Sequence, residues 1–205
     1  MTKQRIDFTV LLLSSLCFLM VFSGCSSGND KSSDNVQEKV TAGGNQETSA
    51  LYLENLGEFS VQDITGESYT QEMFSDYDLT MVNVFTTWCT PCVNEIPDLE
   101  KLKNELSGQG VNVVGFVLDA IDGNGNTSED AIEKAKLLAE KTGVSYPFLI
   151  PDQSYLNGRL SGINAVPETF FVDKEGNIVG STYSGSRSFE DWKSIVETEL
   201  KGAAK

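Results

Sequence analysis

From about Leu51 onward, short apolar runs alternate with segments of helical periodicity. The runs at Leu79–Phe85 and Val111–Leu118 are almost continuously apolar, and Phe148–Ile150 and Thr169–Val172 are shorter runs of the same kind. Continuous apolar runs of this length, bounded by turn residues, are typical of strands buried on both faces of a sheet. The pattern therefore predicts a sheet covered on both sides.

Three segments with helical spacing accompany these runs. The apolar positions of the first are Ile96, Leu99, Leu102 and Leu106. Thr127 with Asp130 forms a capping-box pattern that predicts the start of the second helix, and Gly143 predicts its end. Ser188 and Asp191 predict the start of the last helix. Its apolar stripe is Phe189, Trp192, Val196 and Leu200.

Two turn patterns complete the outline of the fold. Phe59–Asp63 and Ser68–Thr70 flank Thr65–Glu67, which predicts a short hairpin near residue 60. Asp173–Asn177 predicts a turn into a strand that begins at Ile178. Strands and helices that alternate, followed by a hairpin and a closing helix, predict an α/β fold. We expect a central mixed β-sheet flanked by helices on both faces, with an N-terminal β-hairpin extension.

Residues 1–24 have the pattern of a signal peptide. Lys3 and Arg5 precede an almost unbroken apolar run at Phe8–Phe22, which is too short for a comfortable membrane span. An uncleaved anchor helix is the alternative. The run closes on Phe22–Ser23–Gly24–Cys25, which resembles the bacterial lipoprotein processing box. The resemblance implies that Cys25 is lipidated and holds the protein to the outer face of the bacterial cell membrane.

The remaining chain divides into a tether and one domain. Residues 25–50 begin with the lipidated cysteine and are then rich in Ser, Gly, Asn, Asp, Glu and Gln, without apolar periodicity. This composition predicts a flexible tether. Residues 51–205 are expected to form a single domain, which agrees with a chain of 205 residues.

Charge and composition exclude several classes of function. The chain carries 30 acidic and 15 basic side chains, and a net charge of −15 repels nucleic acid and anionic headgroups. It has no histidine, which excludes Ser–His and Cys–His nucleophile pairs and removes the commonest transition-metal ligand. We therefore expect no nucleic-acid partner, no metal and no other cofactor.

Four cysteines remain to be explained. Cys17 lies in the leader and Cys25 is the lipidation site, whereas Cys89 and Cys92 stand together at a strand-to-helix junction. A helix N-terminus favours a thiolate, so Cys89 is predicted to be a solvent-facing nucleophile. Cys92, one turn further in, is suited to resolve a mixed disulfide by attacking Cys89.

Three other interpretations of the pair are less well supported. A zinc half-site needs two more ligands, and the chain offers neither histidine nor a further free cysteine pair. A structural disulfide across so short a loop contributes little stability. Two free core thiols are disfavoured in an exported protein. The spacing therefore favours redox chemistry, with Thr90 and Pro91 setting the redox poise.

The segment at residues 87–97, TWCTPCVNEIP, resembles the active-site segment of the TlpA/ResA-like branch of the thioredoxin superfamily. Trp88 directly before the pair and Pro97 five residues after it make this match specific. The likeness continues to residues 166–173, VPETFFVD, and covers about residues 56–200. It implies a thioredoxin-like fold with a redoxin, or AhpC/TSA-like, domain and a thiol-disulfide oxidoreductase activity.

The resemblance also assigns roles to residues outside the pair. It implies that the Val166–Pro167 peptide bond is cis and packs beside the cysteines, where the Val166 backbone would pair with an extended substrate peptide. Glu95 would lie near the cysteines and influence their pKa values, with Glu168 a second candidate. The alternative for Glu95 is a solvated acid in the first helical turn. Asn83 stands where cytoplasmic thioredoxins carry a buried aspartate, so that proton-acceptor role is vacant or relocated.

We therefore assign catalysis to Cys89, Cys92, Glu95 and Pro167, and substrate binding to Trp88, Thr90, Pro91, Val166 and Glu168. No Lys, Arg or His lies between the strand and Lys101, so little stabilises a thiolate except the helix terminus. This predicts a reductant. We expect a monomer that passes electrons to protein disulfides, and the resemblance implies that a CcdA/DsbD-type membrane protein supplies them. Candidate substrates are apocytochrome c, oxidised cell-wall or spore-coat enzymes, and an extracytoplasmic methionine sulfoxide reductase.

Two other functions remain open. A peroxiredoxin-like peroxidase would have proline where Val82 stands, although Thr86 does lie three residues before Cys89. Trp88 and a second cysteine only three residues on favour disulfide exchange. A redox-inactive binding module is the other alternative, but such modules commonly lose a cysteine.

Overall fold

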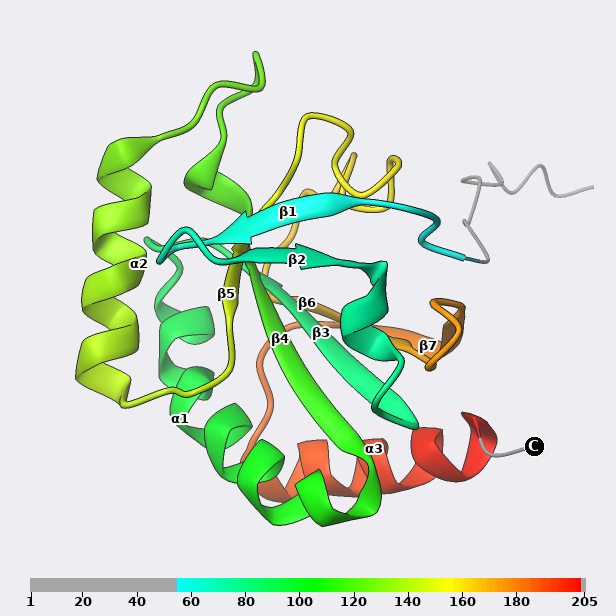
Figure 1. The fold of residues 1–205 in the computed structure, drawn as a ribbon. Helices are drawn as coiled ribbons and strands as arrows, with labels where there is room; N and C mark the ends of the chain where they lie inside the picture. The colour runs from blue at the N-terminus through cyan, green and yellow to red at the C-terminus, as the bar shows by residue number, and fades with distance from the viewer. Residues whose placement is uncertain (1–54, 204–205) are drawn as a thin grey trace, which may run out of the picture. The chain divides into compact units, whose positions relative to one another are not determined.

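The computed structural model describes residues 55–203, which form a layered α/β unit around one seven-stranded sheet (Figure 1). The strand order is β2-β1-β5-β4-β3-β6-β7. The strands are β1 (Ser60–Asp63), β2 (Ser68–Thr70), β3 (Leu79–Phe85), β4 (Val111–Val117), β5 (Phe148–Ile150), β6 (Glu168–Val172) and β7 (Ile178–Ser184). The central pairs β3–β4 and β4–β5 are parallel and all the others are antiparallel. The predicted mixed sheet with flanking helices is confirmed.

The two faces of the sheet carry separate apolar cores. Helices α1 (Thr90–Leu106), α2 (Glu129–Thr142) and α3 (Phe189–Ala203) all contribute to one core. The other core is covered by the short 3-10 helix η1 (Gln71–Phe74) and by a loop that contributes Leu156 and Leu160. Two more 3-10 helices, η2 (Ser107–Gln109) and η3 (Leu118–Ala120), follow α1 and β4.

Alternation along β3 divides its side chains between these cores. Met81 and Phe85 belong to the core beneath the three α-helices, whereas Val82 and Val84 belong to the other. Successive side chains of a strand point to opposite faces, so Asn83 lies on the same face as Met81 and Phe85. A polar side chain is thereby placed beneath the helices, and it is only 1% exposed.

The N-terminal hairpin is confirmed, with β1 and β2 antiparallel and Gln62 paired with Ser68. Asp63 holds the turn, because its Oδ1 accepts hydrogen bonds from the backbone N–H groups of Thr65 and Glu67. β1 begins at Ser60, one residue later than predicted. The hairpin joins the main sheet through β5.

Besides the start of β1, and that of β6 at Glu168 rather than Thr169, two predicted boundaries are wrong by one residue. The N-cap of α2 is Ser128, whose side chain accepts from the Ala131 N–H, and Thr127 is instead engaged in a β-bridge with Ile121. The strand predicted to end at Leu118 ends at Val117, where the chain turns into η3. Gly143 ends α2 in the left-handed conformation, at φ +67°, as predicted.

The predicted leader, the predicted lipidation site at Cys25 and the predicted tether lie outside the residues that the structure describes. Within residues 55–203, none of the helices has the length and apolar character that a membrane span requires.

Candidate redox site

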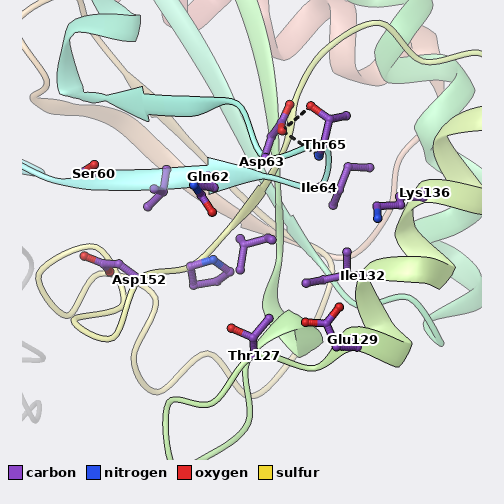
Figure 2. A pocket seen from close by; sticks show the side chains of 14 residues that line it. Ser60, Gln62, Asp63, Ile64, Thr65, Thr127, Glu129, Ile132, Lys136 and Asp152 are labelled. Atoms are coloured by element: carbon purple, nitrogen blue, oxygen red, sulfur yellow. Dashed lines mark hydrogen bonds between the residues drawn. The ribbon is translucent and has the colours of Figure 1, made fainter.

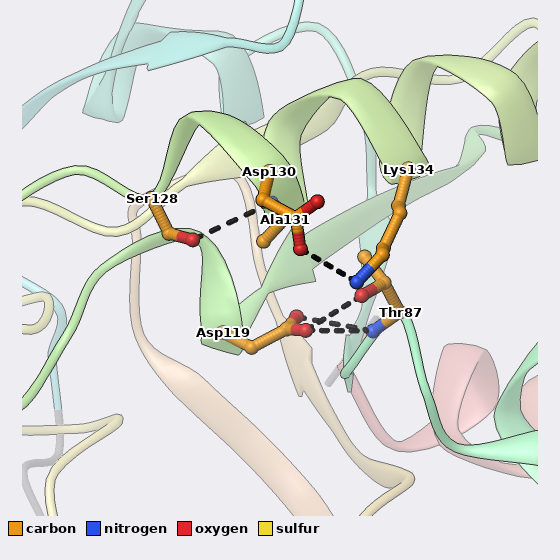
Figure 3. Close-up of polar contacts among 6 residues, drawn as sticks. All are labelled: Thr87, Asp119, Ser128, Asp130, Ala131 and Lys134. Atoms are coloured by element: carbon orange, nitrogen blue, oxygen red, sulfur yellow. Dashed lines mark hydrogen bonds and ion pairs between the residues drawn. The ribbon is translucent and has the colours of Figure 1, made fainter.

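One carboxylate, that of Asp119, holds the loop between β3 and α1 just before the cysteines. Asp119, in η3 after β4, accepts a hydrogen bond from the Thr87 backbone N–H at 3.0 Å and another from the Thr87 hydroxyl at 2.7 Å. Lys134 of α2 extends over the same region and bonds Asp130 at 2.6 Å (Figure 3). The backbone two residues before Cys89 is thus held to the end of the neighbouring parallel strand.

Cys89 is the N-cap of α1, and Cys92 lies in its first turn. The two are joined by a disulfide, with Cα atoms 5.3 Å apart. The Cys92 backbone N–H is 3.3 Å from Cys89 Sγ, so an unsatisfied amide of the helix start points at this sulfur. A thiolate formed at Cys89 would receive this amide and the positive end of the helix dipole.

The exposure predicted for Cys89 is wrong. Cys92 is fully buried, and Cys89 is only 6% exposed. The Val166 carbonyl oxygen lies 3.6 Å from Cys89 Sγ and covers it on one side. The order of accessibility is nevertheless the one expected of a nucleophile and its resolving partner, since only Cys89 retains any exposed surface.

The Val166–Pro167 peptide bond is cis, as the resemblance implies, and the ordinary trans bond is excluded. Pro167 is buried, and β6 begins directly after it at Glu168. The backbone of Val166 therefore lies next to the disulfide, although 77 residues separate Val166 from Cys89.

Glu95 is buried in α1, with 2% of its surface exposed. The Asn83 side-chain amide donates to Glu95 Oε1 at 3.0 Å. The Trp192 indole N–H and the Arg187 backbone N–H each donate to Oε2 at 3.2 Å. The alternative of a solvated first-turn acid is therefore wrong.

Burial raises the pKa of Glu95 above its ordinary value, because a charged carboxylate loses its hydration. The hydrogen bonds from Trp192, Asn83 and the Arg187 backbone, and the charge of Arg187, each lower it and offset part of the rise. Residues three apart in a helix share a face, so Glu95 lies on the same side of α1 as Cys92. A carboxyl group with a raised pKa thus stands one turn from the buried cysteine.

The comparisons with known proteins agree with this geometry. The family model described as "AhpC/TSA family" matches residues 54–181. The chain belongs to the AhpC/TSA family.

Two relatives of this chain are named for thiol-disulfide exchange. The chain is 30% identical over 131 residues to the "Thiol:disulfide interchange protein DsbE" of Haemophilus influenzae, a match that covers 64% of each chain. It is 27% identical over 143 residues to the "Thiol-disulfide oxidoreductase ResA" of Geobacillus thermodenitrificans, covering 69% of this chain and 74% of that one.

A solved structure supports the same assignment. The thiol:disulfide interchange protein of Chlorobium tepidum superposes with a TM-score of 0.57 at 26% identity, and the match covers 70% of this chain and 93% of that one. With the Cys89–Cys92 disulfide, these similarities identify this AhpC/TSA-family chain as a thiol-disulfide oxidoreductase of the DsbE and ResA type.

The other predicted site residues differ in their exposure and in their contacts. Trp88 is 72% exposed beside Cys89, and Thr90 and Pro91 are also exposed. A groove of about 360 Å³ begins at these two residues. It is lined by Thr90, Pro91, Asn94, Glu95, Asp98, Ser186 and Arg187. Glu168 is engaged elsewhere, in an ion pair with Arg159 at 2.9 Å.

Sequence reasoning missed Arg187 and the site role of Trp192. The sequence pattern places Trp192 only in the apolar stripe of the last helix. A buried indole needs a hydrogen-bond acceptor, so a tryptophan in a buried stripe is itself a signal that a polar group lies opposite. Arg187 offers no such signal, because its backbone N–H makes the contact with Glu95.

A larger hollow, of about 500 Å³, lies between the β1–β2 turn and the first turns of α2 (Figure 2). Asp63, Ile64, Ile132 and Lys136 contribute to its wall, and none of its lining residues belongs to the cysteine site. The hollow is thus separate from the redox site at the start of α1.

Proposed function

We propose that this protein reduces disulfides of other proteins outside the cytoplasm, while lipid on Cys25 holds it to the outer face of the bacterial cell membrane. The observation that carries the proposal is the Cys89–Cys92 disulfide at the start of α1, with the buried Glu95 one turn further along. The names of the relatives support the exchange reaction, and the leader sequence supports the location.

One round of disulfide reduction involves the reduced protein and its substrate. In the reduced protein the Cys89 thiolate attacks a substrate disulfide, which forms a mixed disulfide and releases one substrate sulfur as a thiolate. Cys92 gives its proton to Glu95 and attacks Cys89 Sγ, which releases the second substrate sulfur. Two electrons have then passed to the substrate, and the protein carries the Cys89–Cys92 disulfide. The two released sulfurs take up one proton from Glu95 and one from water. A CcdA/DsbD-type membrane protein would return the two electrons.

The exposed surface around Cys89 suits a peptide substrate. We assign contacts with the substrate to Trp88, Thr90 and Pro91, and backbone pairing to Val166. The Val166 carbonyl, 3.6 Å from Cys89 Sγ, would accept a hydrogen bond from an extended peptide laid beside the sulfur. We also assign a substrate contact to Glu168, whose carboxylate is paired with Arg159.

The charges around the pair favour a reductant. A strong oxidant needs a stabilised thiolate in its reduced form. The cation that lines the same groove, Arg187, instead bonds the carbonyl oxygens of Ser184 and Gly185. Glu95 and Asp98 bring negative charge to that groove. The helix start is then the main stabilisation of a Cys89 thiolate, which predicts a low reduction potential.

A trapping experiment tests the proposed function. Replacing Cys92 by serine leaves Cys89 able to attack but removes the resolving sulfur, so the full-length variant should accumulate mixed disulfides with its substrates in cells. On non-reducing gels the mixed disulfides appear as complexes of higher mass, and treatment with dithiothreitol removes them. The double variant C89S/C92S, in which both sulfurs are absent, is the matched control and should trap nothing. Equal trapping by both variants, or by neither, would contradict the proposal.

A further inference from the structure

Three separate elements donate hydrogen bonds to the one carboxylate of Glu95. Asn83 comes from β3, Trp192 comes from α3, and the Arg187 backbone comes from the loop between β7 and α3. Because Glu95 is only 2% exposed, these donors stand in place of water. The arrangement forms only when β3, the loop before α3 and α3 itself are all in place, because each of them supplies one donor.

The two side chains in this set act as donors only. Asn83 uses both N–H groups of its amide, one on Glu95 Oε1 and one on Thr169 Oγ1 at 3.1 Å. Its buried Oδ1 has no hydrogen-bond partner within residues 55–203. An indole N–H can only donate, and Trp192 is fully buried. The hydrogen-bond partners of Glu95 therefore favour its ionised form over its protonated form.

Few charged or titratable groups face Glu95 from the elements around it. Arg187 is the cation, and its guanidinium lies 5.0 Å from the Trp192 ring and 5.1 Å from the Tyr183 ring. Asp98, whose carboxylate has the same sign of charge as that of Glu95, lines the same groove. The buried Tyr146 phenol lies in the segment before β5. Burial raises the pKa of this phenol, and the charge of Glu95 adds to the rise.

We propose that Trp192 and Asn83 are positioning residues that hold Glu95 ionised and oriented to take the proton of Cys92. This inference rests on the proposed function, in which Glu95 is the acceptor of that proton. Cys92 loses its proton to the carboxylate, and the resulting thiolate attacks Cys89. Glu95 on α1 is then the proton acceptor, and the amide of Asn83 supports its carboxylate from β3.

The test is the pH dependence of exchange in the full chain with Trp192→Phe. Phenylalanine keeps an aromatic ring in the core but removes the indole N–H. Losing one hydrogen bond to an ionised group should move the pH midpoint assigned to Glu95 upward by about 1–2 pH units. Below that midpoint, the reduced protein should reduce an oxidised model peptide with a Cys–x–x–Cys disulfide more slowly, about tenfold for each pH unit by which the midpoint rises. NMR titration of the Glu95 carboxyl carbon in the oxidised protein follows the same midpoint without turnover.

Three further variants make the outcome decisive. Tyr183→Phe is the matched control, because Tyr183 packs on Trp192 but donates its hydroxyl to Glu199, and it should leave the midpoint in place. Asn83→Ala should move the midpoint in the same direction as Trp192→Phe and serves if that variant does not fold. In a Glu95→Gln background, Trp192→Phe should produce no further change in the profile.

The outcomes separate this inference from the function on which it rests. If Glu95→Gln leaves the pH profile unchanged, Glu95 is not the proton acceptor and that part of the proposed function fails. If Glu95→Gln removes the midpoint but Trp192→Phe and Asn83→Ala leave it where it is in the wild type, the positioning role alone is overturned.

Discussion

Replacing Cys89 by serine is expected to abolish disulfide exchange, leaving the rate of reduction of an oxidised protein at the uncatalysed background. The hydroxyl of serine has no accessible anionic form at neutral pH, so the helix start that would stabilise a thiolate has nothing to act on. Cys92 cannot substitute, because it is fully buried whereas Cys89 retains 6% exposure. Turnover is measured with a thiol reductant that recycles the protein.

The control for this variant is Cys92→Ser. It also fails to turn over, but it should still form one mixed disulfide per molecule through Cys89, which a labelled model disulfide detects by mass spectrometry. Cys89→Ser should form none. Exchange at the wild-type rate by Cys89→Ser would mean that Cys89 is not the nucleophile.

Replacing Phe85 by alanine is expected to destabilise the oxidised protein by about 3–5 kcal/mol. Phe85 is fully buried at the end of β3, just before the active-site loop, and its ring centroid lies 4.9 Å from that of Phe148. Gly115 of β4 leaves the space into which this ring packs, because a Cβ there would lie 3.0 Å from Phe85 Cε1. The ring is packed tightly on all sides. Its removal therefore leaves a cavity and also loses the burial of apolar surface.

Leu137→Ala is the matched control, because Leu137 is also apolar but is 47% exposed on α2. Its cost should stay within about 0.5 kcal/mol. Urea denaturation of both variants under non-reducing conditions gives the two free energies of unfolding. A loss below about 1 kcal/mol for Phe85→Ala would show that the packing around this ring is not as tight as described.

The fold is largely predictable because its central strands, β3 and β4, are buried on both faces. Runs such as Leu79–Phe85 are too short for a typical helix and are bounded by turn residues, which favours a buried strand. All seven residues of this run are buried in β3. Errors are confined to element ends, where local contacts decide. Ser128 and Thr127 are both favoured cap residues. In the fold Thr127 forms a β-bridge with Ile121, and Ser128 caps the helix.

The site is predictable where it is local in sequence and less so where it is assembled from distant segments. The cysteine pair lies at a strand-to-helix junction that the pattern marks clearly. The burial of Glu95 depends on α3 and on the loop before it, which lie far along the chain and bring Trp192 and Arg187 to its carboxylate. Cys89 is expected from the sequence to face solvent, because the sequence does not show the Val166 carbonyl that covers it.

The measurement that tests the account most directly is the reduction potential of the Cys89–Cys92 pair. The full-length protein is equilibrated with a series of glutathione or dithiothreitol redox buffers, and the fraction of reduced cysteines is determined by alkylation and mass spectrometry. The charges around the pair predict a potential near that of thioredoxin, about −270 mV. A value near that of a dedicated oxidant such as DsbA, about −120 mV, or a disulfide that no buffer of the series reduces, would contradict it.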